Sequence, residues 1–82
     1  MQVTVRLFGH EARAAGRATV SVQLADERCT CGRLREALLA AEPSLAATLP
    51  QCRLAVNHSF ASDTQPIAAT DEVALIGLVS GG

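Results

Sequence analysis

The residues best suited to do chemistry are the last four of the sequence, Val79-Ser80-Gly81-Gly82. Glycine has no side chain to stop the backbone from entering a narrow channel. The α-carboxylate that follows is ionised at pH 7, so acyl transfer from Gly82 needs prior activation of its oxygen as a leaving group. Four extended residues span about 13 Å, enough to reach into the active site of another protein. The alternative is that these residues are a loose terminus without a role.

Three cysteines and two histidines are the remaining candidates. Cys29 and Cys31 form a C-x-C pair, which matches none of the usual zinc patterns even if Cys52 and one of His10 or His58 are added. We therefore expect no metal site. An odd number of cysteines argues against a disulfide framework, and Cys52 fits a small buried hydrophobe. We expect both histidines to lie on the surface without a role.

Size and composition restrict the function classes. The 82 residues form one domain, 1–82, with a flexible tail at 79–82, and 49% of them are apolar. A net charge of −1 and only two aromatic residues argue against nucleic-acid binding. Apolar runs fall far short of the roughly 20 residues that a membrane span needs, and no signal peptide opens the sequence. We expect a soluble, cytoplasmic protein without a nucleophile–base pair, and so without catalytic activity of its own.

Alternating apolar residues predict the first two strands. Val3, Val5 and Leu7 alternate with polar residues, and the same pattern returns from Val20 to Leu24. These strands are expected to pair as a hairpin. Between them, Glu11–Ala15 is expected to form one helical turn that Gly16 closes in the left-handed conformation.

One helix follows. Thr30 is a good N-cap, and Leu34, Leu38 and Ala41 recur on one helical stripe that faces a core. Pro43 ends the helix because the residue before a proline is pushed out of helical geometry.

The second half of the sequence is predicted to form strands. Residues 52–56 predict a third strand, Phe60 lies in a short extended piece, and residues 72–79 predict an apolar last strand. The order is strand, strand, helix, strand, short strand, strand. It predicts an α+β fold: a mixed four- to five-stranded sheet with one main helix packed across one face. The first and last strands are expected to pair in parallel at the centre. This is the β-grasp, or ubiquitin-like, architecture.

Several motifs along this order are shared with one family. They are Val5-Arg6-Leu7-Phe8, Thr30-Cys31-Gly32-Arg33-Leu34, Leu54-Ala55-Val56-Asn57, Asp71-Glu72-Val73-Ala74-Leu75-Ile76 and Val79-Ser80-Gly81-Gly82. With them the chain resembles the MoaD/ThiS family of ubiquitin-like sulfur carriers, above all the small subunit of molybdopterin synthase. The resemblance covers nearly the whole chain.

The resemblance implies a function for the tail. An ATP-dependent enzyme would adenylate Gly82, and a sulfurtransferase or cysteine desulfurase would supply the sulfur that converts it to a thiocarboxylate (1-thioglycine). Gly81, Ser80 and Val79 would enter a large catalytic subunit within a heterotetramer. There the sulfur would pass to cyclic pyranopterin monophosphate in molybdenum cofactor biosynthesis. The chain itself would bind no cofactor.

Docking on such partners requires an exposed apolar patch on the open face of the sheet. The expected members are Phe8, Phe60, Leu75 and Leu78. Strand alternation places Phe8 on the face opposite to Val3, Val5 and Leu7. For Phe60, a place in a satellite core is an equal alternative.

The chain departs from the family just before the tail. Synthase small subunits usually carry an aromatic pair and two prolines where this chain has Leu75-Ile76-Gly77-Leu78. Prolines would stiffen the approach to the tail, whereas Gly77 loosens it. This departure leaves open a carrier for thiamine thiazole, cysteine or tRNA thiolation. A β-grasp binding module or protein-conjugated modifier is also left open.

Overall fold

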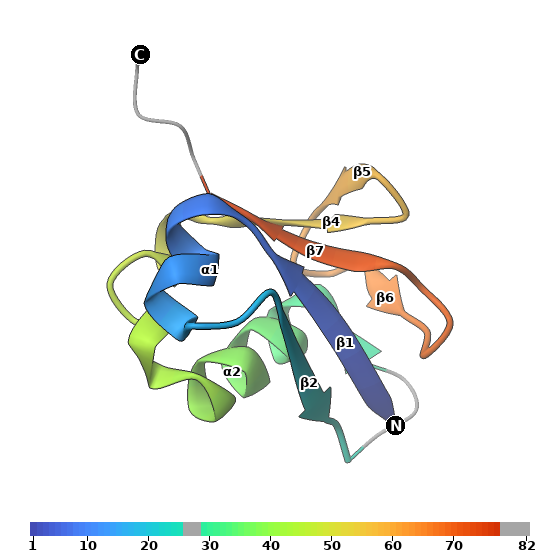
Figure 1. Cartoon of the computed structure of the whole chain (residues 1–82). Helices are drawn as coiled ribbons and strands as arrows, with labels where there is room; N and C mark the ends of the chain where they lie inside the picture. The colour runs from blue at the N-terminus through green and yellow to red at the C-terminus, as the bar shows by residue number, and fades with distance from the viewer. Residues whose placement is uncertain (26–28, 78–82) are drawn as a thin grey trace.

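The computed structural model describes residues 1–25 and 29–77. The predictions for Leu78 and for Val79 to Gly82 lie outside the described residues. The main element is a five-stranded sheet (Figure 1). Across the sheet its strands are β2 (Thr19–Gln23), β1 (Gln2–Leu7), β7 (Val73–Ile76), β4 (Arg53–Val56) and β5 (Ser59–Ala61).

The pairing confirms the expected β-grasp architecture. β1 is antiparallel to β2 and parallel to β7, with Val5 opposite Val73 and Leu7 opposite Leu75. β7 is also antiparallel to β4, which forms a hairpin with β5. The first and last strands therefore lie side by side in the middle of the sheet. The last strand is shorter than the sequence predicted, because β7 ends at Ile76.

The helix α2 (Cys31–Ala41) covers one face of this sheet (Figure 1). The hydroxyl of Thr30 accepts a hydrogen bond from the amide of Arg33 at 3.3 Å, which confirms the predicted N-cap. Leu34 and Leu38 are fully buried against the inward-facing strand residues.

The expected third member of this stripe is wrong, because Ala41 is exposed. The helix ends there, and the 3-10 turn η1 (Pro43–Leu45) brings Leu45 into the core in its place. Proline ends the helix and its 3.6-residue repeat, so helical spacing no longer predicts which residues are buried near Pro43.

The segment after β1 forms more helix than expected. α1 (Gly9–Ala15) follows β1 directly and ends at Gly16, whose φ of 70° confirms the left-handed cap. Its one buried charged residue is Glu11, which is 5% exposed.

Three further elements have no counterpart in the sequence prediction. β3 (Cys29–Thr30) pairs with β6 (Pro66–Ile67), and η2 (Leu49–Gln51) precedes β4. Strands of two residues are too short to show a period, so sequence patterns miss them.

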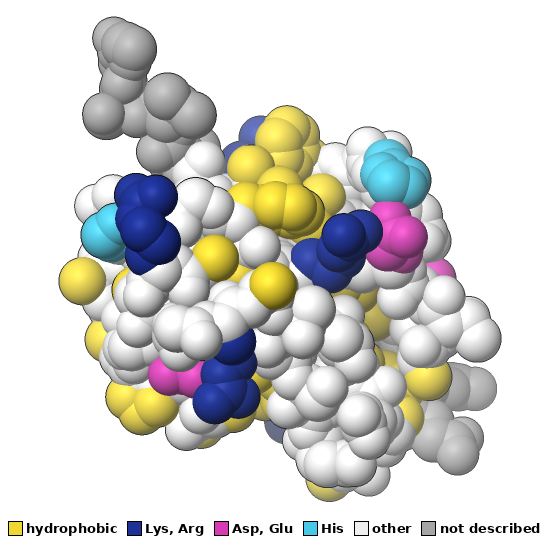
Figure 2. All heavy atoms as spheres, viewed as in Figure 1, with side chains coloured by type: hydrophobic (Ala, Val, Ile, Leu, Met, Phe, Trp, Pro, Cys, Tyr) yellow, Lys and Arg dark blue, Asp and Glu magenta, His cyan; other side chains and the backbone are white. Residues whose placement is uncertain are grey.

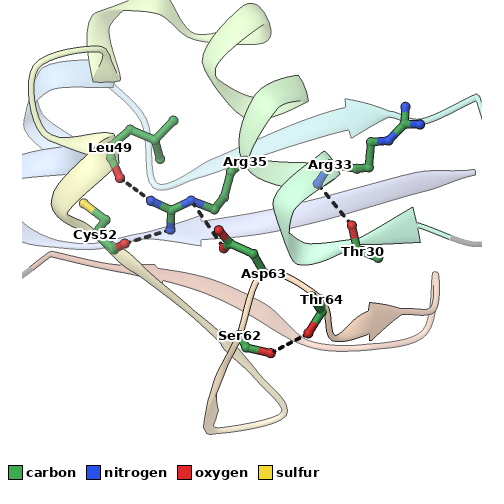
Figure 3. A network of polar contacts seen from close by, with 8 residues as sticks. All are labelled: Thr30, Arg33, Arg35, Leu49, Cys52, Ser62, Asp63 and Thr64. Atoms are coloured by element: carbon green, nitrogen blue, oxygen red, sulfur yellow. Dashed lines mark hydrogen bonds and ion pairs between the residues drawn. The ribbon is translucent and has the colours of Figure 1, made fainter.

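Arg35 of α2 joins η2 and the start of β4 to the helix (Figure 3). Its guanidinium donates to the carbonyl oxygens of Cys52 at 2.7 Å and Leu49 at 2.8 Å. Its Nε lies 3.8 Å from the carboxylate of Asp63. Among the described residues, no helix is long and apolar enough to cross a membrane.

Candidate functional site

The open face of the sheet, opposite α2, carries a row of side chains in which two small residues lie between two large ones. Arg6, Ala74, Ala55 and Phe60 are cross-strand neighbours on β1, β7, β4 and β5. Adjacent side chains on one face of a sheet lie about 5 Å apart, so two alanines in the middle leave a depression between larger neighbours.

Large apolar side chains form the walls of this depression. It is a groove of about 320 Å³ lined by Phe8, Ala55, Phe60, Ala74 and Ile76, together with Arg6, His58 and Glu72 at its edges. We call the five apolar residues the apolar patch. Phe8 is 49% exposed and Phe60 57% exposed. Figure 2 shows a hydrophobic cluster of this kind on the surface, with basic side chains on either side.

The patch matches part of the sequence prediction. Phe8 lies on the side that alternation predicted, and Phe60 is exposed rather than part of a satellite core. Leu75 was predicted wrongly, because it is fully buried and faces α2 with Val73. The same alternation that exposes Phe8 turns Ala74 and Ile76 outward and Leu75 inward. Leu78 lies outside the described residues.

Charged groups flank the aromatic rings. The guanidinium of Arg53 lies 4.4 Å from the ring centroid of Phe60, and that of Arg6 lies 5.8 Å from the ring of Phe8. Both distances are within the range of cation–π attraction, which helps to hold the exposed rings in place. At the far edge, His58 Nε2 lies 2.9 Å from Glu72 Oε2. His58 is therefore a surface residue at the edge of the groove.

A tight turn fixes that edge. Asn57 and His58 have φ values of 52° and 71°, as the turn between β4 and β5 requires. The Asn57 side chain accepts from the amide of Glu72 at 2.9 Å and donates to the carboxylate of Asp71 at 3.1 Å. The amide of Ala68 donates to the other oxygen of Asp71 at 2.8 Å.

These hydrogen bonds make stability depend on pH at the acid end. The Ala68 amide, and then the Asn57 side chain, hold the pKa of Asp71 below its usual value. A depressed folded-state pKa adds stability above the unfolded-state pKa of about 3.9, and this stability is lost as the pH falls through the folded-state value. We expect Asp71→Asn to lower the free energy of unfolding at pH 7 and to leave it nearly unchanged below about pH 2. Urea unfolding at both pH values checks this. An equal loss at both would contradict it.

The cysteines take no part in this site. Cys29, Cys31 and Cys52 are buried and unpaired by disulfides. Burial is the main cause that raises the pKa of the Cys31 and Cys52 thiols, which makes both poor nucleophiles. Within residues 1–25 and 29–77, no group of three or more His, Cys, Asp or Glu side chains could hold a metal ion. His10 lies on α1 and is exposed.

The apolar patch lies where the central strand ends. β7 contributes Ala74 and Ile76 to the patch, and Gly77 follows immediately. Gly77 therefore directly follows a residue of the patch, at the end of the strand that both neighbouring strands hold in place. Sequence reasoning missed Ala55, Ala74 and Ile76, because β7 is apolar at every position and only its pairing with β1 and β4 determines which side chains face outward.

This fold, with an apolar patch beside the end of its central strand, defines a ubiquitin-like domain. The model of the ThiS family matches residues 5–82, and the chain belongs to this MoaD/ThiS family of ubiquitin-like sulfur carriers. No curated protein matches the chain.

Solved structures agree with the fold. The chain is 31% identical to SAMP1 from Haloferax volcanii, with 100% of each chain covered and a TM-score of 0.86. A putative molybdopterin converting factor subunit 1 from Pyrococcus furiosus is 17% identical, with 96% and 99% covered and a TM-score of 0.82. A complex of subunits 1 and 2 of molybdopterin-converting factor from Helicobacter pylori 26695 gives 24% identity, full coverage of both chains and a TM-score of 0.69. At these lower identities the likeness concerns the fold alone.

Proposed function

We propose that the chain carries sulfur on the carboxylate of Gly82 as the small subunit of molybdopterin synthase. An ATP-dependent enzyme adenylates this carboxylate with release of pyrophosphate, and a sulfur nucleophile then displaces AMP to give a thiocarboxylate. The thiocarboxylate gives its sulfur to cyclic pyranopterin monophosphate within the large catalytic subunit. The positive groups and metal that adenylation needs belong to the partner enzyme.

The observation that carries this proposal is the position of the apolar patch. It lies beside the end of β7, so a partner that binds the patch receives the residues after Gly77 at a fixed place. Membership of the sulfur carrier family supports the chemistry at Gly82. The Helicobacter pylori complex of subunits 1 and 2 supports a large subunit as the kind of partner.

The groove also indicates the chemistry of the partner surface. A projecting apolar side chain fits between Phe8 and Phe60, over Ala55 and Ala74. Carboxylates on the partner would pair with the guanidinium groups of Arg6 and Arg53 at the rim, which favours rapid and oriented association.

A second candidate is a protein modifier whose Gly82 is joined to amino groups of other proteins. The observation that favours it is the 31% identity to SAMP1 over the full length of both chains. A related small archaeal modifier protein 1 structure from H. volcanii is 29% identical, with 95% and 98% covered. A carrier for thiamine thiazole, cysteine or tRNA thiolation shares the same first step.

Intact mass spectrometry tests the shared step. The chain is incubated with ATP, a sulfur source and cell extract, and we expect its mass to rise by the difference between sulfur and oxygen. A control chain with one residue added after Gly82 has no carboxylate at that position and should not change. An unchanged wild-type mass, in an extract that charges a known carrier, would contradict every carrier function.

The acceptor is then identified with the charged chain. Transfer to cyclic pyranopterin monophosphate by a large synthase subunit supports the first proposal, and covalent attachment to other proteins supports the second. All seven basic side chains of the sequence are arginine, so lysine-linked conjugates would report other proteins as acceptors rather than copies of this chain.

A further inference from the structure

Glu11 is an unusual residue to find inside this fold. It is 5% exposed and is the one buried polar or charged side chain among the described residues. The other buried side chains of the described residues are apolar, so Glu11 stands out among them. Neither the patch nor the proposed chemistry at Gly82 uses this residue.

The contact is with Gly77. A Cβ added to Gly77 would lie 3.0 Å from Cδ of Glu11 and 3.2 Å from Oε2, and closer still to Oε1. Among the described glycines, Gly9 and Gly16 have a left-handed φ and Gly77 does not. A methyl group at position 77 therefore requires the carboxylate end of Glu11 to move, whereas the backbone conformation there needs no glycine.

Glu11 acts where the strand pairing stops. The pairing of β7 with β1 ends at Leu75, and its pairing with β4 ends at Ile76. Gly77 is the next residue, and the carboxylate of Glu11 packs against it from α1. At Gly77, where the backbone pairs of β7 have ended, the chain is in contact with the side chain of Glu11 instead.

Cys52 lies close to Glu11. The thiol of Cys52 donates to the Thr48 carbonyl at 3.2 Å, and the carboxylate of Glu11 adds to the burial that raises the pKa of this thiol. The Cys52 carbonyl in turn accepts from Arg35 of α2, as Figure 3 shows. Glu11, Cys52 and Gly77 line one cavity of about 430 Å³ at this end of the sheet.

We propose that Glu11 is a positioning residue that holds Gly77 and thereby sets the direction in which the chain leaves β7 toward Gly82. Its importance for charging rests on the proposed function, whereas the contact itself does not. Five residues follow Gly77, and they span at most about 17 Å when extended. A shift of Gly77 therefore moves the point from which these five residues start, and displacements of about 1 Å can lower rates about 100-fold.

Double variants test whether position 77 is restricted by Glu11. We expect Gly77→Ala to lower kcat/KM for charging about 100-fold, mainly through KM. Glu11→Ala combined with Gly77→Ala should regain at least 10-fold of this loss, because the methyl group then has room. Glu11→Gln combined with Gly77→Ala should regain nothing, because glutamine fills the same space.

Glu36→Gln, on the exposed face of α2, is the control carboxylate change. If Glu11→Ala fails to fold, Glu11→Asp combined with Gly77→Ala replaces it, because the shorter aspartate also leaves room for the methyl group.

Nuclear magnetic resonance of the whole chain gives a readout that needs no enzyme. We expect Overhauser contacts between Glu11 side-chain protons and Gly77 α-protons, and a rigid amide at residue 77 with an order parameter near 0.85. In Glu11→Ala this parameter should fall below about 0.6. If wild type shows these contacts but is not converted to the thiocarboxylate, the proposed function is overturned and the contact between Glu11 and Gly77 is not. Two outcomes would overturn the role of Glu11. In the first, Gly77→Ala is charged as fast as wild type. In the second, Glu11→Ala combined with Gly77→Ala is charged as slowly as Gly77→Ala alone.

Discussion

Replacing Gly81 with leucine is expected to stop the charging of Gly82 and to leave the folded domain intact. Any Cβ next to the reacting carboxylate widens the backbone at the point where an activating enzyme must enclose it, and glycine alone permits such close approach. We expect kcat/KM for charging to fall at least 100-fold, as for other misplaced reacting groups (about 10²-fold). The rate of mass increase on incubation with ATP and a sulfur source measures this.

The unfolding free energy of the same variant should stay within about 0.5 kcal/mol of wild type, as is usual for substitutions outside a packed core. Ser80→Ala is the matched control, because it changes the tail without adding bulk, and it should charge nearly as fast as wild type. A Gly81→Leu chain that charges at the wild-type rate would show that the tail enters no narrow channel.

The double variant Phe8→Ala/Phe60→Ala is expected to lose most of its affinity for the large synthase subunit. Both rings are about half exposed in the free chain, at 49% and 57%, and form the walls of the groove. Aromatic anchors at the centre of an interface typically contribute about 2–4 kcal/mol each, so Kd should rise by about three orders of magnitude or more. Titration calorimetry with the purified large subunit measures the change.

Leu39→Ala provides the control for this prediction. Leu39 is also a large exposed hydrophobic residue, at 37%, but it lies on α2, which covers the opposite face of the sheet. The Leu39→Ala variant should bind the large subunit with the same Kd as wild type. If Leu39→Ala weakens binding as much as the double variant, the partner docks on the helix face and the apolar patch is not the interface.

Period and pairing rules predicted most of the fold. Val3, Val5 and Leu7 alternate so regularly that they determine both the inward face of β1 and the outward direction of Phe8. Thr30 and Pro43 mark the ends of the main helix because their chemistry acts locally, one through a capping hydroxyl and the other through its ring. Such signals need no knowledge of the rest of the chain.

The errors arose where distant segments decide the outcome. Leu75 sits in a run of apolar residues without visible alternation, so only its pairing with β1 and β4 determines that it faces inward. Glu11 looks like a surface residue in a short polar helix, and its burial depends on Gly77, more than 60 residues later in the sequence. Gly77 was predicted to loosen the approach to the tail, and this stays a prediction; nothing in the sequence indicated that its neighbour in the structure is Glu11.

The parallel pairing of β1 with β7 has a practical consequence for handling the molecule. Both strands run in the same direction, so the amino terminus and Gly77 lie at opposite ends of the sheet. The amino group of Met1 donates to the carbonyl of Leu24 at 2.7 Å, and an amide nitrogen placed there by a fusion can make the same bond. Affinity tags, fluorophores or a sensor surface attached at that end would therefore leave the patch and the residues beyond Gly77 open to a partner in solution.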